Sequence, residues 1–316
     1  MSVFTTLQRP ELEDFLQSFA LGRLHTYQGI AEGAENSNFF VSLDTGDYVL
    51  TLVERGERCN LPFTVSLLDR LHQAGLPVPF AVSNAQGQTL FQLAGKPALL
   101  QPRLPGRHIL QPNAHHCTEV GMVLARMHLA TSVDMIEHPS DRGLTWMHTQ
   151  SQLLSKQLSG NSLELLTDVA HTALQLQQAW ESLPKANLHA DLFRDNVLFD
   201  GPHLSGIIDF HNACSGPMLY DVAIALNDWC STAAGDLDEA LADALLRGYA
   251  GLRPFTMAET HHWYAFLQVS CLRFWLSRLL AANTSNLPGV QIKPPVEFEQ
   301  RLQHRKEKQI SLPLAL

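Results

Sequence analysis

The sequence predicts an α+β protein with two lobes, a small antiparallel β-sheet lobe at residues 1–103 and a larger, mainly helical lobe at residues 104–316. Three observations predict this class. The chain has 316 residues, more than a single hydrophobic core usually serves. Apolar residues alternate as in strands in the first part, and they recur with a helical period from residue 113 onward. A hairpin pattern at 188–210 then interrupts the helices.

The N-terminal part predicts two helices with strands between and after them. Residues 9–21 carry the first amphipathic helical pattern. The β-rich runs at 39–43 and 48–54 flank DTGD, a hairpin signal, and QGIAEG before them predicts another strand. The second helix, at 62–74, has Pro in its first turn and ends at Gly75. Two short strand-like runs follow it before residue 104.

The C-terminal part is helical on both sides of the hairpin. The helix that begins at 113 places Val120, Val123, Leu124 and Met127 on one apolar stripe. One or two long helices are expected at 150–182. The remaining helical patterns cover 218–230, 236–250, 257–283 and 295–307.

The composition excludes several classes of protein. The net charge of −9 gives the chain as a whole no electrostatic footprint for nucleic acid. The five cysteines are far apart and form no C-x-x-C pair, which argues against a disulfide framework and a structural zinc site. The N-terminus lacks a signal-peptide pattern, and no stretch reaches the ~18 uncharged apolar residues of a membrane span. We therefore expect a cytoplasmic protein that binds neither nucleic acid nor a membrane.

The stretch LHADLFRDNVLFDG, residues 188–201, opens the hairpin and is the leading candidate for a functional site. Asp-Gly between two apolar runs is a strong hairpin signal. If the loop closes between Asp200 and Ser205, the pairing places Asn196 opposite Asp209. The hairpin is therefore predicted to return Asp209 to the point where its first strand begins.

Asp191 lies one short loop before Asn196, so two carboxylates and a carboxamide are expected to converge. Such hard oxygen ligands suit Mg²⁺, especially when substrate phosphates complete its coordination. A lone H-x-D, or a lone hairpin that ends in Asp, is usually structural. The combination H-x-D-x-x-x-x-N, a hairpin and an apolar triplet ending in Asp favours the functional interpretation.

HADLFRDN followed by IIDF resembles the catalytic loop and metal-binding Asp of the protein-kinase-like phosphotransferases. Asp-Phe without a following Gly, together with YDVA at 220–223, is similar to the aminoglycoside-phosphotransferase and choline-kinase branch. Across nearly the whole chain, motifs such as ENSNFF, LNDWC and RFWLSRL look like the homoserine kinases of this type. The resemblance implies a protein-kinase-like fold and ATP-dependent phosphorylation of the side-chain hydroxyl of L-homoserine, in threonine biosynthesis.

The resemblance implies roles for the residues of the catalytic loop and its surroundings. Asp191 would accept the proton of the attacking hydroxyl or orient it. Asn196 and Asp209 would be the Mg²⁺ ligands. His189 and Asp221 would brace the loop without taking part in the chemistry.

The resemblance also implies a nucleotide-binding part of the N-terminal lobe. EGAENSN, residues 32–38, looks like the loop that covers the nucleotide, although by itself it is equally compatible with a polar hairpin tip. The expected ATP-binding residues of this loop are Glu35, Asn36, Ser37 and Asn38. Backbone groups from Gln101 to Arg103 are expected to contact the adenine.

The chain departs from the superfamily at the strand YVLTLVE, where Thr51 stands in place of a phosphate-binding Lys. Arg55, further along on the same face, or the metal ion is expected to carry that charge. A nucleotide-binding pseudokinase would also lack the Lys, and this rival interpretation rests on that one feature.

A homoserine site needs an anionic group for the ammonium and a cationic group for the carboxylate. We hypothesise that Asp228 binds the ammonium, Arg273 the carboxylate, and that Trp229 lines the site. Arg278 lies five residues after Arg273, so at most one of the two is expected in the site, and a surface salt bridge is the alternative for each. A choline, ethanolamine or aminoglycoside kinase is the nearest rival. A choline site would require an aromatic cage, which Trp146, Trp229, Trp263 and Trp275 leave open.

Overall fold

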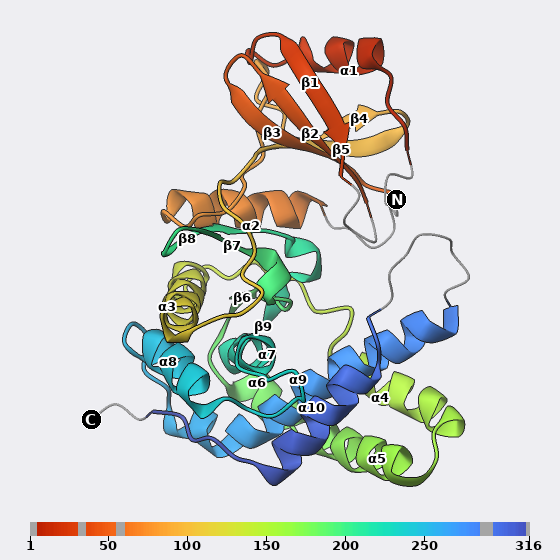
Figure 1. Ribbon diagram of the computed structural model, residues 1–316, viewed down its shortest axis with the longest axis vertical. Helices are drawn as coiled ribbons and strands as arrows, with labels where there is room; N and C mark the ends of the chain where they lie inside the picture. Colours follow the sequence, from red (N-terminus) through yellow and green to blue (C-terminus); the bar gives the residue numbers. More distant parts are fainter. Residues whose placement is uncertain (1–4, 31–35, 55–60, 285–292, 314–316) are drawn as a thin grey trace. The chain divides into compact units, whose positions relative to one another are not determined.

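The computed structural model describes residues 5–30, 36–54, 61–284 and 293–313 (Figure 1). These residues divide into two compact units, with the division between Pro105 and Gly106. The smaller unit is built on an antiparallel sheet and the larger is mainly helical. The predicted α+β class is confirmed.

The smaller unit contains a five-stranded sheet in the order β1-β2-β3-β5-β4, and every pairing is antiparallel. The strands are β1 (Leu24–Gly29), β2 (Ser37–Leu43), β3 (Gly46–Leu52), β4 (Phe91–Leu93) and β5 (Lys96–Pro102). The expected DTGD hairpin joins β2 to β3, with Leu43 paired to Gly46. Gly46 has a φ of 141°, which only Gly adopts readily.

Two helices accompany this sheet. α1 (Arg9–Leu16) buries Leu12 and Leu16 in a core that the inward side chains of the strands complete. It is shorter than the predicted helix because Phe19 already packs into that core and Gly22 turns the chain at φ 85°. α2 (Leu61–Gln73) agrees closely with the prediction, and Gly75 follows it at φ 74° as a C-terminal cap.

The larger unit is a helical assembly around α7, whose residues are all buried. Its helices are α3 (Ala114–Thr131), α4 (Leu144–Leu154), α5 (Gly160–Gln175), α6 (Gln177–Ser182), α7 (Met218–Trp229), α8 (Glu239–Ala250), α9 (Met257–Thr284) and α10 (Val296–Glu307). The region predicted as one or two helices at 150–182 is divided among α4, α5 and α6. α3 and α8 approach closely at Gly121 and Gly248, where a Cβ would meet backbone of the other helix.

Two short strand pairs carry the catalytic-loop region. β6 (Lys185–Leu188) pairs with β9 (Cys214–Pro217), and β7 (Val197–Asp200) pairs with β8 (His203–Ile207). Both pairings are antiparallel. The loop of interest therefore begins where β6 ends and leads directly into β7.

The predicted register of the hairpin is wrong by one residue. Val197, not Leu198, pairs with Ile207, and Asp200 pairs with His203. The turn closes earlier than expected because Gly201, at φ 57°, allows a two-residue connection. A register shift between Leu198 and Phe199 then offsets the pairing of the remaining strand.

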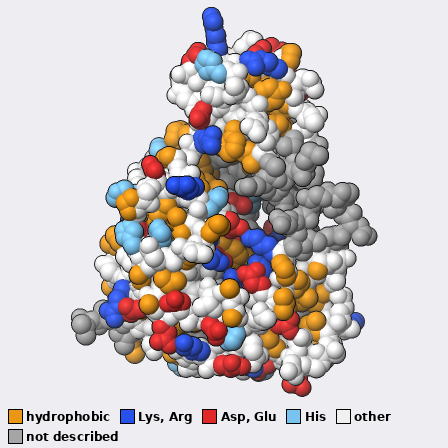
Figure 2. Space-filling view, in the orientation of Figure 1, with side chains coloured by type: hydrophobic (Ala, Val, Ile, Leu, Met, Phe, Trp, Pro, Cys, Tyr) orange, Lys and Arg blue, Asp and Glu red, His pale blue; other side chains and the backbone are white. Residues whose placement is uncertain are grey.

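Helix α9 is long and apolar enough to cross a membrane by length and composition, with a mean hydropathy of 1.2 in an 18-residue window within Met257–Asn283. However, 56% of that window is buried inside the protein, which is also typical of a core helix. On the face shown in Figure 2, Lys and Arg side chains of the described residues lie among Asp and Glu side chains. The cysteines among the described residues are free and buried, as the sequence predicted.

Candidate active site

The loop after β6 is held from behind by Asp221, which lies in the first turn of α7. The backbone N–H of His189 donates to Asp221 Oδ2 and that of Ala190 donates to Oδ1, each at 2.8 Å. Ala190 has a φ of 59°, a left-handed conformation that costs energy for a residue with a Cβ. The paired acceptor oxygens of Asp221 thus stabilise a sharp turn just before Asp191.

Asp221 is fully buried and also contacts His128 on α3. The distance from His128 Nε2 to Asp221 Oδ2 is 3.2 Å, and His128 Nδ1 lies 2.8 Å from the hydroxyl of Tyr249 on α8. Burial acts to raise the pKa of Asp221, but His128 and the N–H of His189 outweigh it and hold that pKa below its ordinary value. His128 was not among the predicted site residues. A His on the apolar side of the predicted helix could have indicated it.

His189 ties the loop to the end of β8. Its Nε2 donates to the carbonyl of Ile208 at 2.9 Å, and because a carbonyl only accepts, this nitrogen carries the proton. Burial lowers the pKa of His189, against the opposing effect of Asp221. The imidazole is therefore a neutral, structural donor at neutral pH.

Asp191 lies deep in the larger unit but keeps a partly exposed surface. Burial, with a smaller contribution from the charges of Asp209 and Asp195, raises the pKa of Asp191 to about 7, while Arg273 opposes the rise. Asn212 Nδ2 donates to Asp191 Oδ2 at 3.0 Å. A carboxylate with this pKa near neutrality is suited to accept a proton from a hydroxyl.

Asn196 and Asp209 lie near Asp191 despite the shifted hairpin register. Asn196 Nδ2 donates to the carbonyl of Asp191 at 2.8 Å, so the amide oxygen is the end left for a cation. Ile208 N–H donates to the carbonyl of Asn196, and Asp209 follows it in a left-handed conformation at φ 64°. The hairpin thus places Asp209 one residue beyond Asn196 rather than opposite it.

The donor set fits a magnesium ion that shares its coordination with phosphate oxygens. Among the residues that the structure describes, no group of three or more His, Cys, Asp or Glu side chains could hold a metal by itself. One carboxylate and one amide oxygen are hard ligands of the kind Mg²⁺ prefers, and this ion often takes its other ligands from phosphates and water.

The residues predicted for the nucleotide-binding loop have different surroundings in the smaller unit. Glu35 lies outside the described residues. Ser37 is buried and donates to Glu54 Oε1, while Asn36 Oδ1 accepts from the backbone N–H of Glu54 at 3.3 Å. The side chains of Asn36 and Ser37 are thus engaged at the strand end. They leave only backbone groups or Asn38 as candidate ligand contacts of the described loop.

Asn38 and Thr51 form a pair across β2 and β3. Thr51 Oγ1 donates to Asn38 Oδ1 at 2.7 Å, at the strand position where the resemblance implied a Lys. Arg55, the expected substitute, lies outside the described residues. Gln101 Nε2 donates to the carbonyl of Pro79 at 3.1 Å. Arg103, the other residue predicted near the adenine, has its guanidinium 4.0 Å from the centre of the Phe40 ring.

Asp228 and Trp229, the predicted substrate contacts on α7, face inward. Trp229 is 0% exposed, and its indole N–H donates to the carbonyl of Leu192 at 3.0 Å. Asp228 Oδ2 accepts from the backbone N–H of Arg194 at 2.8 Å, and Oδ1 lies 3.4 Å from Arg301 Nη1. Both side chains hold the catalytic loop in place, and their polar atoms are engaged there by Arg194, Arg301 and the carbonyl of Leu192.

Arg273, the third predicted substrate residue, extends from α9 toward the catalytic loop. Its Nη2 donates to Asn212 Oδ1 at 2.9 Å, and its guanidinium lies 3.9 Å from the centre of the Phe274 ring. Arg278 instead pairs with Glu297, which agrees with the expectation that only one of these two arginines belongs to the site. Asn212 was not among the predicted site residues. Its carboxamide, three residues after Asp209 in the same turn, could have indicated a role in the site.

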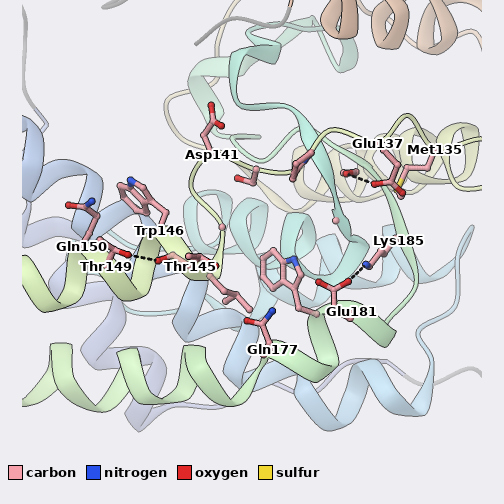
Figure 3. Close-up of a pocket in the computed structure, with 17 residues that line it drawn as sticks. Met135, Glu137, Asp141, Thr145, Trp146, Thr149, Gln150, Gln177, Glu181 and Lys185 are labelled. Carbon is pink, nitrogen blue, oxygen red and sulfur yellow. Dashed lines mark hydrogen bonds and ion pairs between the residues drawn. The ribbon is translucent and has the colours of Figure 1, made fainter. Parts of the chain in front are cut away.

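A separate cavity of about 520 Å³ opens elsewhere in the larger unit (Figure 3). Asp141 and Trp146 lie on one side of it, and the ion pair of Glu181 with Lys185 lies on the other. None of the residues predicted for the site lines this cavity.

Comparison with known proteins defines the class first. The profile of the "Phosphotransferase enzyme family" matches residues 26–255. The structure of an amicoumacin kinase in complex with AMP-PNP and Ca²⁺ aligns with a TM-score of 0.67 at 16% identity, covering 95% of this chain and 93% of that one. A choline kinase from Cryptosporidium parvum aligns with a TM-score of 0.65 at 14% identity, covering 95% of each chain. The chain therefore belongs to the phosphotransferase enzyme family, and its fold is the kinase-like fold of these neighbours.

Sequence relatives narrow the class. The homoserine kinase of Pseudomonas aeruginosa strain UCBPP-PA14 is 58% identical over 316 residues, 100% of both chains. That of Methylobacillus flagellatus is 39% identical over 310 residues, 96% of this chain and 95% of its own. The chain therefore belongs to the homoserine kinases of the phosphotransferase enzyme family.

Proposed function

We propose that the protein transfers the γ-phosphoryl group of ATP to the side-chain hydroxyl of L-homoserine, giving O-phospho-L-homoserine and ADP, with Asp191 as the proton acceptor. The assignment rests on 58% identity to a homoserine kinase over the full length of both chains. The chain also has the proposed proton acceptor, Asp191, and both proposed metal ligands, Asn196 and Asp209. The threonine pathway follows from this reaction, and a cytoplasmic location is proposed with it.

The proposed chemistry needs little from the protein beyond positioning. The homoserine hydroxyl donates to Asp191, its oxygen bonds to the γ-phosphorus, and the bond from that phosphorus to the ADP oxygen breaks. Asp191 takes the hydroxyl proton at its carboxylate, and the pKa of about 7 matches that task at neutral pH. Asp221 and His189 keep the loop in the geometry that this transfer requires.

We propose that Asn196 and Asp209 hold Mg²⁺ together with phosphate oxygens of ATP. When bound, Mg²⁺ neutralises charge on the β- and γ-phosphates. The neighbour that binds AMP-PNP was solved with Ca²⁺, which supports a divalent ion in this fold. Asn38, the backbone of the 36–38 segment, and the Gln101 to Arg103 segment are the proposed nucleotide contacts among the described residues.

For the amino acid substrate we propose Arg273 as the partner of the carboxylate. Asp228 and Trp229 are not carried into this role, because one is occupied by two arginines and the other is fully buried. Trp229, Trp263 and Trp275 are buried in the core and offer no choline cage, while Trp146 is half-buried and lines the separate cavity of the larger unit.

A coupled ADP-release assay on the purified protein tests the proposal. We expect kcat/KM for L-homoserine to be at least about 100-fold higher than for L-serine, choline, ethanolamine or an aminoglycoside. L-Serine lacks one methylene, and the other compounds lack the carboxylate that pairs with Arg273. Chelation by EDTA should abolish turnover, and Mg²⁺ should restore it. Equal turnover of choline and homoserine would falsify the substrate assignment.

A further inference from the structure

We propose that Asn212 is a specificity-determining positioning residue that fixes the spacing between Asp191 and Arg273. Through that spacing it selects the carbon-chain length of the hydroxy amino acid that is phosphorylated. The inference rests on the proposed function, because it takes Asp191 as the acceptor of the hydroxyl proton and Arg273 as the partner of the carboxylate.

The amide of Asn212 bridges the two groups directly. Its nitrogen donates to Asp191 Oδ2 at 3.0 Å, and its oxygen accepts from Arg273 Nη2 at 2.9 Å. A carboxamide is the side chain that can donate at one end and accept at the other with a fixed separation. The two hydrogen bonds and the covalent bonds of the amide hold Asp191 Oδ2 within about 8.5 Å of Arg273 Nη2.

Both ends of this bridge are anchored. Arg273 is 4% exposed, comes from α9, and has its guanidinium carbon 3.9 Å from the centre of the Phe274 ring. Phe274 in turn contacts Phe193 of the catalytic loop, with ring centroids 4.5 Å apart. Asn212 ends a short 3₁₀ turn, Phe210–Asn212, that begins directly after Asp209. The bridge therefore connects the metal-binding turn, the catalytic loop and α9.

The guanidinium retains donors for a carboxylate. One of its five N–H groups contacts Asn212, and no described residue accepts a side-chain hydrogen bond from the other four. A bidentate pair with a substrate carboxylate is the geometry for which guanidinium is best suited. The substrate would then extend from Arg273 to Asp191 alongside Asn212, with its hydroxyl at one end and its carboxylate at the other.

A fixed spacing discriminates by length. L-Serine is one methylene shorter than L-homoserine, which moves its hydroxyl by roughly 1.3 Å when the carboxylate is held. A displacement of about 1 Å at a reacting group costs on the order of 100-fold in rate. L-2-Amino-5-hydroxypentanoate, one methylene longer, would be displaced by a similar distance in the opposite direction.

The plain alternative is that Asn212 only satisfies polar groups and stabilises the fold. Such a role would lower the folded fraction or the turnover number for every substrate in the same proportion. The ratio of kcat/KM values between chain-length homologues does not depend on how much of the enzyme is folded. That ratio therefore separates the two roles.

The experiment measures kcat/KM for L-serine, L-homoserine and L-2-amino-5-hydroxypentanoate in the wild type, Asn212→Ala and Asn212→Ser. The exposed Asn161→Ala in α5 is the matched control. We expect the homoserine-to-serine ratio to fall by roughly tenfold or more in both Asn212 variants, the scale of one methylene, and to stay unchanged in the control. Asn212→Ser keeps a hydroxyl that donates and accepts, so it serves as the folded variant if Asn212→Ala does not accumulate.

The outcomes are distinguishable from failure of the proposed function. If the wild type does not phosphorylate L-homoserine, both proposals are overturned. If the wild type phosphorylates L-homoserine but the homoserine-to-serine ratio of kcat/KM in the Asn212 variants stays within about twofold of the wild-type ratio, only the spacing role is wrong. A twofold change is well below the effect of one methylene.

Discussion

The catalytic loop contains one carboxylate, Asp191, and is braced by another, Asp221, and the pKa values of the two shift in opposite directions although burial acts to raise both. Asp221, behind the loop, is fully buried, yet its pKa lies below the ordinary value. For Asp191, in the loop itself, burial prevails and its pKa is raised to about 7. Asp221 accepts from two backbone N–H groups and contacts His128, whereas among the described residues only the Asn212 amide donates to the carboxylate of Asp191. The number of donors, rather than depth, decides which carboxylate stays ionised.

The largest effect is expected on the front side of the loop. Asp191→Asn removes the proton acceptor, and we expect kcat to fall by roughly 1,000-fold, within the range for loss of a general base. The variant should remain folded and should bind ATP nearly as well as the wild type, because the charge that it removes is one that burial disfavours. Steady-state kinetics and a nucleotide-binding titration check this, and retained turnover would remove Asp191 from the mechanism.

The next effect is expected behind the loop. Asp221→Ala leaves the N–H groups of His189 and Ala190 without their acceptor and His128 without its carboxylate, and we expect a loss of about 3–5 kcal/mol in the free energy of unfolding. Asp243→Ala, on the exposed face of α8, is the control and should change stability by less than about 0.5 kcal/mol. Urea denaturation measures both. Equal losses in the two variants would mean that the loop does not depend on Asp221.

The two carboxylates should also respond to pH with opposite signs. A base with a raised pKa is lost on acidification, so kcat/KM should fall about tenfold per pH unit below pH 7 as Asp191 is protonated. Its effect on folding has the other direction, since the unfavourable ionisation of Asp191 is relieved as the pH falls from 7 toward 3.8. Asp221, whose pKa is lowered, contributes stability above its ordinary value of 3.8 and loses it only as the pH falls through its lower folded pKa.

The fold should therefore persist over the pH range in which activity is lost. Circular dichroism between pH 5.5 and 8 should be constant while kcat/KM declines. A flat activity profile over this range, or unfolding that parallels the loss of activity, would contradict the contrast between the two carboxylates.

The smallest expected effect concerns the outer partner of His128. Tyr249→Phe removes only the hydroxyl that contacts His128 Nδ1 at 2.8 Å, and we expect a destabilisation of about 1–2 kcal/mol with kcat nearly unchanged. Thermal and urea unfolding, with kinetics on the same preparation, provide the measurement. A large loss of kcat with unchanged stability would extend the site to α8.

Local patterns predicted the framework of the protein well. The DTGD hairpin, the end of α2 at Gly75 and the helices α7 to α10 follow from turn residues, apolar periodicity and capping, which act over a few neighbouring residues. The hairpin after the catalytic loop was predicted but its register was not. A Gly at positive φ and a register shift changed the pairing by one residue, and neither is specified by apolar alternation.

Contacts between distant segments were the part that sequence reasoning missed. His128 and Asp221 are 93 residues apart, and Arg273 and Asn212 are 61 residues apart. Asp228 and Trp229 are residue types expected in a site for an ammonium group. However, helix α7 is buried on every side, and both side chains contact the catalytic loop instead. Residue type and spacing do not indicate how deeply a helix will be enclosed.

The sequence by itself determined the two-part α+β organisation, the kinase-like motif and the residue types of the proposed chemistry, because turns, periodicity and short motifs are local properties. Only the tertiary structure decided which carboxylate is stabilised as a charge and which is left near neutrality, and it alone joined Asn212 to both Asp191 and Arg273. The physical reason is that hydrogen bonds and desolvation depend on which side chains packing brings together, and packing is set by the whole chain.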